Sequence, residues 1–214
     1  MGRAGRTLPS HQIAGLFLLA GSAVFALGIT IAETLYPAYS VSHDFLADLG
    51  GGPSALVFNS SITFFGIALI AAGVFLFRAF RDLPLTVALV LAGIGAIGFG
   101  LVPATDNLAP ETYRNLAIHT GFALAAYFFA ALAAILAVRV VRSPFGYISV
   151  ALGIVSLVAL GLLGTDQYGI LGRGGMERMV VWPLLLWGVA VGGSLLTIRS
   201  LDKKGVASVG TAQT

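Results

Sequence analysis

Six long apolar stretches limit what this chain can fold into more than any other feature of its sequence. They cover residues 13–35, 56–77, 84–102, 116–138, 145–163 and 179–198. A helix that crosses a bilayer needs about 20 mostly apolar residues, and it satisfies its backbone polar groups internally. Continuous apolar runs fit helices and do not show the alternation of barrel strands. The sequence therefore predicts an all-α polytopic integral membrane protein, a bundle of six transmembrane helices.

The composition supports this class and excludes others. Hydrophobic residues make up 57% of the chain and charged residues only 10%, whereas a soluble domain has about 45–50% and about 25%. A soluble globular protein and a disordered chain are both excluded. The absence of cysteine excludes a disulfide framework and any zinc or iron–sulfur site with cysteine ligands. We expect one membrane domain at 13–198, between a cytoplasmic N-terminus (1–12) and a polar cytoplasmic tail (199–214). The first stretch exceeds the roughly 7–15 apolar residues of a signal peptide, so we interpret it as a span.

The charged residues predict an orientation in the membrane. Basic residues concentrate on the side that holds both termini: Arg3, Arg6, Arg78, Arg81, Arg139, Arg142, Arg199, Lys203 and Lys204. By the positive-inside rule this side is cytoplasmic. We therefore predict a multi-pass protein of the cell membrane with both termini inside. The basic collar suits contact with anionic membrane lipids, and nothing in the pattern indicates nucleic-acid binding.

The first outer segment, SVSHDFLADLGGGP at 40–53, carries several polar side chains. Ser42 can cap a short helix with Asp44 in its first turn, and Asp44 and Asp48 are four residues apart. We expect a short interfacial helix over the outer mouth of the bundle. In the functional interpretation, His43, Asp44 and Asp48 project into a cavity. In the structural alternative, the serines and aspartates only cap helices at a wet surface.

A second polar segment, ETYRNLAIH at 111–119, leads into the fourth span. Glu111, Asn115 and His119 follow a spacing of four and form one stripe on a helix, with Arg114 at its border. Asn59 lies at a similar depth in the second span, and polar residues within spans usually face the bundle interior. The predicted outer pocket consists of His43, Asp44, Asp48, Asn59, Asp106, Glu111, Arg114, Asn115 and His119, with Glu33 at its rim. In the alternative interpretation, Asn59 and His119 form a hydrogen bond that only fixes helix packing.

Four segments carry a resemblance to a known family. They are YSVSHDFLADLG (39–50), FNSSITFFG (58–66), the end of the third span at 103–106, and RNLAIHTGF (114–122). In these segments the chain resembles the six-span membrane family labelled domain of unknown function 998. The resemblance implies a compact helical membrane fold and no established activity. A looser similarity, in the serine–aspartate–glycine segment before a span, connects it to Frag-type membrane proteins of lipid-anchor remodelling.

Two functions follow from these residues. The first is a non-enzymatic membrane protein that binds or handles a lipid or small molecule in an outer-facing polar pocket. The alternative is a metal-dependent intramembrane lipid hydrolase, with zinc held by His43, His119 and an aspartate such as Asp48. Alkaline-ceramidase-like hydrolases carry paired histidines on the last span, and 179–198 contains none. The sequence therefore favours a protein without enzyme activity or cofactor, and leaves zinc as the alternative.

Small residues on the last span offer a contact between helices. Gly188 and Gly192 form a pattern that lets two helices approach closely in lipid. The pattern predicts either tight packing within the chain or a homodimer through these two glycines.

Overall fold

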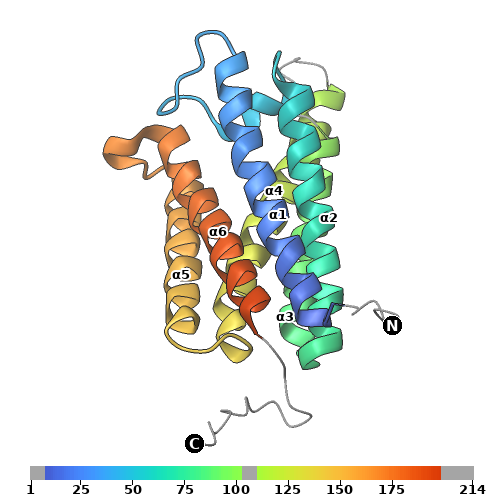
Figure 1. The fold of residues 1–214 in the computed structure, drawn as a ribbon. Coiled ribbons are helices and arrows are strands. Elements are labelled where there is room, and N and C mark those ends of the chain that lie inside the picture. The colour runs from blue at the N-terminus through green and yellow to red at the C-terminus, as the bar shows by residue number, and fades with distance from the viewer. Residues whose placement is uncertain (1–7, 103–109, 199–214) are drawn as a thin grey trace, which may run out of the picture.

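The computed structural model describes residues 8–102 and 110–198, the side chains of 110–114 excepted. Six long helices make up most of this part of the chain (Figure 1): α1 (Ser10–Leu35), α2 (Ala55–Phe80), α3 (Leu83–Leu101), α4 (Pro110–Leu136), α5 (Phe145–Gly164) and α6 (Gly172–Thr197). Three short 3-10 helices connect them: η1 (Leu46–Gly50), η2 (Ala137–Arg139) and η3 (Gly169–Leu171). The described ranges contain no strand. Six helices are long and apolar enough to cross a membrane, so the predicted all-α, six-span architecture is confirmed.

The helices follow one another around a closed ring. Each packs against its neighbour in the sequence, and α6 packs back against α1. Figure 1 shows the start of α1 and the end of α6 at the same end of this bundle. We call the end where α1 begins and α6 ends the proximal end, and the opposite end the distal end. The ring places the distal start of α6 against the loop that follows α1.

Close packing of small residues closes the ring between α1 and α6. A Cβ atom added to Gly188 would lie 2.0 Å from the hydroxyl oxygen of Ser22, and one added to Gly192 would lie 2.7 Å from the carbonyl oxygen of Gly15. Both glycines of α6 are therefore covered by α1, which is the packing within the chain that their spacing also predicted. A homodimer through Gly188 and Gly192 stays a prediction.

Polar contacts fasten the proximal ends. The Nε2 atom of His11 lies 3.1 Å from the carbonyl oxygen of Ile198, and the Gln12 amide donates to the same oxygen at 3.0 Å. Asp82 caps the start of α3 by accepting from the backbone N–H of Leu85 at 3.0 Å. Its other oxygen forms an ion pair with Arg139 at 3.0 Å. These contacts join α1 to α6 and the α2–α3 turn to the segment after α4.

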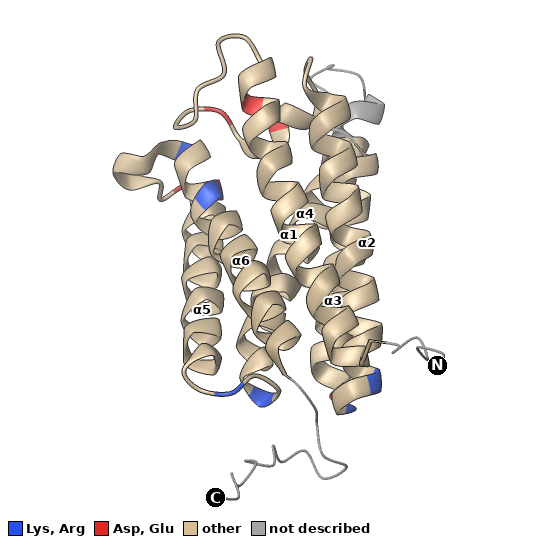
Figure 2. Ribbon diagram, viewed as in Figure 1, with Lys and Arg blue, Asp and Glu red and all other residues tan. Residues whose placement is uncertain are grey.

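Charges divide between the two ends of the bundle. Figure 2 shows acidic residues grouped at the distal end, and basic residues at the proximal end and at the start of α6. This asymmetry agrees with the charge pattern of the sequence. That the proximal end faces the cytoplasm remains a prediction.

The distal end differs from the prediction in two ways. Helices α4 and α6 begin before the apolar stretches at 116–138 and 179–198, at Pro110 and Gly172, and in α6 the charged residues of the added turns find partners inside the protein. The first distal loop contains only the 3-10 helix η1, which starts after Phe45 and is not capped by Ser42. Asp44 instead accepts from the backbone N–H of Ser40 at 2.7 Å, so it closes a turn before the helix.

Candidate functional site

The first distal loop rests directly on the start of α6. The backbone N–H of Gly174 donates to the carbonyl oxygen of Ser42 at 3.0 Å. A Cβ atom on Gly174 would lie 2.1 Å from the carbonyl oxygen of Asp44, so only glycine permits this approach. Arg173 donates from its Nε atom to the carbonyl oxygen of His43 and lies over the Phe45 ring, 4.9 Å from its centroid. The loop is thus attached to α6 by its backbone.

Arg178 fastens this loop to both α1 and α6. One terminal nitrogen of its guanidinium donates to the carbonyl oxygen of Val41 at 2.7 Å. The other donates to a Glu33 carboxylate oxygen at 2.5 Å and to the Tyr39 hydroxyl at 2.9 Å. Burial raises the pKa of Tyr39 to about 12, although the Arg178 hydrogen bond acts in the opposite direction. Arg178 therefore acts as a structural clamp with its charge balanced by Glu33.

Glu177, the residue before this clamp, points to different partners. Its side chain is only 4% exposed. One carboxylate oxygen accepts from the backbone N–H of Leu46 at 2.5 Å, and the other accepts from the Tyr127 hydroxyl at 2.8 Å. Within the described residues Glu177 has no ion pair inside 4 Å. This leaves a buried carboxylate whose hydrogen-bond partners are neutral groups.

His119 on α4 is also buried, and half of its hydrogen-bonding capacity is satisfied. Its Nδ1 atom lies 2.5 Å from the carbonyl oxygen of Val102. A carbonyl oxygen can only accept, so Nδ1 carries the proton and the Nε2 atom of the neutral ring is an acceptor. Nε2 has no hydrogen-bond partner among the described residues, although His119 is only 5% exposed. The ring lies edge-on against Phe99, with centroids 4.6 Å apart.

These two buried groups belong to one region of the bundle. The Phe99 ring contacts both His119 and Tyr127, and Tyr127 donates to Glu177. Asp48 lies on η1, two residues after Leu46, whose backbone N–H donates to Glu177. We call Asp48, His119, Tyr127 and Glu177 the distal polar cluster. It lies under η1, between α4 and α6.

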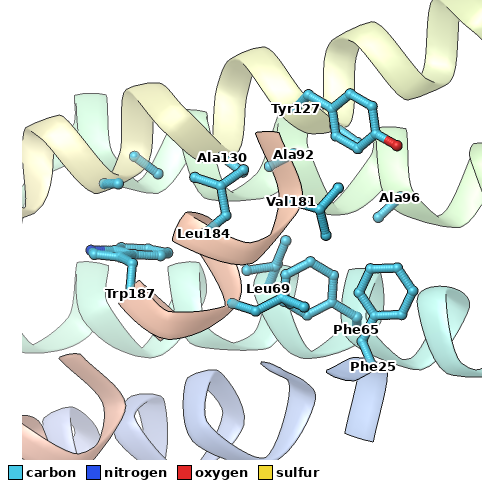
Figure 3. Close-up of a cluster of buried hydrophobic side chains, with 14 of the residues drawn as sticks. Phe25, Phe65, Leu69, Ala92, Ala96, Tyr127, Ala130, Val181, Leu184 and Trp187 are labelled. Atoms are coloured by element: carbon cyan, nitrogen blue, oxygen red, sulfur yellow. The ribbon is translucent and has the colours of Figure 1, made fainter. Parts of the chain in front are cut away.

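An apolar cavity of about 20 Å³ lies next to this cluster. It is lined by residues of α1, α2, α3, α4 and α6: Phe25, Ile62, Phe65, Leu69, Ala92, Ala96, Ala126, Tyr127, Ala130, Val181, Leu184 and Leu185. Figure 3 shows several of these side chains converging from the surrounding helices. Tyr127 belongs to both regions, because its ring lines the cavity while its hydroxyl donates to Glu177.

The structure brings only part of the predicted pocket together. Asp48 and His119 share the distal polar cluster. Asn59 does not contribute to it, because its amide donates to the carbonyl oxygen of Gly50 at 2.9 Å. Asp44 lies 3.9 Å from Arg173 and accepts from the backbone N–H of Ser40.

The remaining predicted positions lie on or beside α4. Asn115 is half-buried one turn before His119. Asp106 and the side chains of Glu111 and Arg114 lie outside the described residues. The predicted stripe on α4 is thus described only at its inner end.

The predicted zinc trio of His43, His119 and Asp48 is not assembled. His43 is exposed, and its Nδ1 atom lies 3.1 Å and 2.9 Å from the hydroxyl oxygens of Ser40 and Ser42. Across 8–102 and 110–198, no group of three or more histidine, aspartate or glutamate side chains is placed to hold a metal ion. His43 fails because its turn directs it toward the neighbouring serines, away from the bundle.

Sequence reasoning missed three members of the site, Glu177, Arg178 and Tyr127. Glu177 and Arg178 fell outside the predicted span because they directly precede the apolar run at 179–198. A charged pair directly before an apolar span was the available signal, since such residues are costly unless they find partners. Tyr127 gave no signal, because one tyrosine in an apolar span is ordinary.

The fold and the site define a multi-pass membrane protein: a six-helix bundle with a buried polar cluster at its distal end. The chain belongs to the family described as protein of unknown function (DUF998), whose model matches residues 19–194. This match confirms the family resemblance found in the sequence. No curated protein and no solved structure matches the chain.

Proposed function

We propose that this protein binds the polar group of a small molecule or lipid at the distal polar cluster. The observation that carries the proposal is the Nε2 atom of His119, which is buried and has no hydrogen-bond partner among the described residues. A buried polar atom without a partner costs about 1–3 kcal/mol. The hydrogen bond from Nδ1 to Val102 is enough to hold the ring in place. We therefore assign the open acceptor at Nε2 to a hydrogen-bond donor of the ligand.

The surroundings of His119 support a binding site. Glu177 supplies a further acceptor, and the rings of Phe99 and Tyr127 supply apolar contact. Buried sites that combine a few polar groups with aromatic walls are typical of ligand binding. The adjacent cavity of about 20 Å³ has room for about one water-sized group. It would receive the first apolar atoms attached to the bound polar group.

The location of the site indicates where the ligand comes from. If the proximal end is cytoplasmic, as the basic residues predict, the cluster lies near the outer surface of the cell membrane. The loop that carries η1 covers it, and Arg178 holds that loop in place. A ligand enters from the outer leaflet or the outer medium.

Native mass spectrometry of the full-length protein in lipid nanodiscs tests the proposal. The wild-type protein should retain a stoichiometric adduct that His119→Phe loses, because phenylalanine preserves the ring but removes the acceptor nitrogen. His43→Ala is the matched control, since His43 is exposed, and it should keep the adduct. If wild type and His119→Phe carry the same species, the proposal is wrong. Stoichiometric zinc in wild type, lost in His119→Phe, would replace it with the hydrolase alternative.

A further inference from the structure

Glu177 gives the distal polar cluster a carboxylate that no cationic side chain of the described residues contacts within ion-pair distance. Glu177 is buried and its partners are the neutral Leu46 N–H and Tyr127 hydroxyl. The nearest base in the sequence, Arg178, directs its guanidinium to Glu33, Tyr39 and two carbonyl oxygens instead. The described part of the chain therefore gives Glu177 no cation within ion-pair distance.

The acceptors also retain unused capacity. Each carboxylate oxygen has about two lone-pair positions, and each oxygen of Glu177 accepts one hydrogen bond from the described residues. The open Nε2 atom of His119 adds an acceptor from α4. A ligand group that fills the acceptor positions of both Glu177 and His119 needs N–H or O–H donors. A positive charge on the same group would balance the charge of the carboxylate.

Aromatic rings lie beside the same groups. The Phe99 ring lies edge-on to His119 and to Tyr127, with centroids 4.6 Å and 6.0 Å apart. Aromatic rings attract cations, and the attraction is strongest where water is excluded. A carboxylate, a lone pair and two aromatic rings together favour an ammonium group over an anion or an apolar group.

We propose that the distal polar cluster binds a primary ammonium group, held by Glu177 and His119 beside Phe99 and Tyr127. This inference rests on the proposed binding function and names the chemical class of its ligand. The ammonium can belong to a free amine or to the headgroup of an aminophospholipid. In both, the N–H groups donate to Nε2 of His119 and to the Glu177 carboxylate.

Thermal unfolding of the full-length protein in nanodiscs tests the ligand class. In phosphatidylcholine nanodiscs, whose quaternary headgroup has no N–H donor, ethanolamine should raise Tm and the neutral isostere ethylene glycol should not. Exchange of phosphatidylcholine for phosphatidylethanolamine with the same acyl chains tests the headgroup as the source. A rise in Tm in either arm supports the proposal, and the arm that responds identifies the source.

Variants make the test specific to the site. Glu177→Gln keeps the shape of the side chain and removes its charge, so it should weaken ethanolamine or headgroup binding by about tenfold or more. His43→Ala should respond like wild type. Because Glu177→Gln also removes a structural contact, His119→Phe provides a second variant that should abolish the rise in Tm.

Two results would overturn the inference, and they differ in what they say of the proposed function. If neither ethanolamine nor phosphatidylethanolamine raises Tm, and mass spectrometry finds a bound molecule without an amine, the site binds another class of ligand. In that case the proposed function stands and the ammonium assignment fails. If no amine shifts Tm and wild type carries no adduct that His119→Phe loses, both fail together.

Discussion

The contact between Glu177 and Tyr127 offers the sharpest test of how the distal end is held together. In Glu177→Ala, the N–H of Leu46 and the hydroxyl of Tyr127 both lose their acceptor in a buried site. Each orphaned donor costs about 1–3 kcal/mol, and the release of a buried carboxylate offsets part of this cost. We expect a net loss of about 3 kcal/mol in unfolding free energy. Tyr127→Phe removes one hydrogen bond to a charged group and should cost about 1.5–3 kcal/mol.

The double variant makes the reasoning testable. In Glu177→Ala/Tyr127→Phe the orphaned hydroxyl is absent, so Tyr127→Phe should cost almost nothing in the Glu177→Ala background. The coupling free energy between the two sites should therefore be about 2 kcal/mol. Tyr147→Phe is the matched control, because Tyr147 is 71% exposed on α5, and it should leave stability unchanged.

Tryptophan fluorescence during thermal unfolding in one mild detergent provides the assay. Both tryptophans, Trp182 and Trp187, lie on α6, the helix that carries Glu177, and Trp187 is only 2% exposed. At about 2–4 °C per kcal/mol for a chain of this size, Glu177→Ala should lower Tm by roughly 6–12 °C. If the two single substitutions add without coupling, the hydrogen bond between Tyr127 and Glu177 does not hold the site and the reasoning is refuted.

Three further predictions concern other parts of the fold. Gly188→Ala should lower the free energy of unfolding by about 1–3 kcal/mol, because the added methyl group overpacks against α1. Gly193→Ala is the control and should be neutral or stabilising, because nothing lies within 4 Å of the added Cβ. Equal effects of the two variants in thermal unfolding would contradict the α1–α6 packing. The Tyr39 phenol should ionise near pH 12 and not near pH 10. Its raised pKa stabilises the fold below pH 10, and this contribution is lost between pH 10 and 12. A difference titration at 295 nm against Tyr39→Phe measures the ionisation, and a midpoint at pH 10 would disprove the prediction. Asp82→Ala should lower the free energy of unfolding by about 1 kcal/mol, because it removes the cap of α3. Arg139→Ala should lower it by less than 1 kcal/mol, because Arg139 is half-exposed in its ion pair. The reverse order in denaturant titrations would show that the ion pair matters more than the cap.

The sequence was sufficient to predict the six spans because the physical signal is large. A helix in lipid must be apolar over about 20 residues, and this requirement leaves uninterrupted runs that neighbouring segments do not share. The sequence was least informative at the start of α6, where charged residues belong to a long helix. Glu177 and Arg178 lie inside α6 because Leu46, Tyr127 and Glu33 supply partners, and such long-range contacts leave no pattern in the local sequence.

The candidate site could be predicted only in part for the same reason. His119 was found because a histidine within an apolar span is unusual, and Asp48 because it lies in a polar segment. His43 lies outside the distal polar cluster, because the direction of its side chain depends on the turn from Ser40 to Asp44. The sequence predicted a helix in place of this turn. Tyr127 required knowledge of which face of α4 meets α6. Which residues are polar is written in the sequence, but which of them face each other depends on how the helices pack.

The contact between α1 and α6 has a consequence for how the protein is assembled during synthesis. Four helices separate the two in the chain, so α1 enters the membrane before its partner exists. Until α6 arrives, Glu33 lacks Arg178, and the surface of α1 around Gly15 and Ser22 is open to lipid or to another protein. We expect this intermediate to be the stage most open to degradation or to capture by an insertion chaperone. Substitutions at the α1–α6 contact would then lower the amount of protein made more than they lower the stability of the finished bundle.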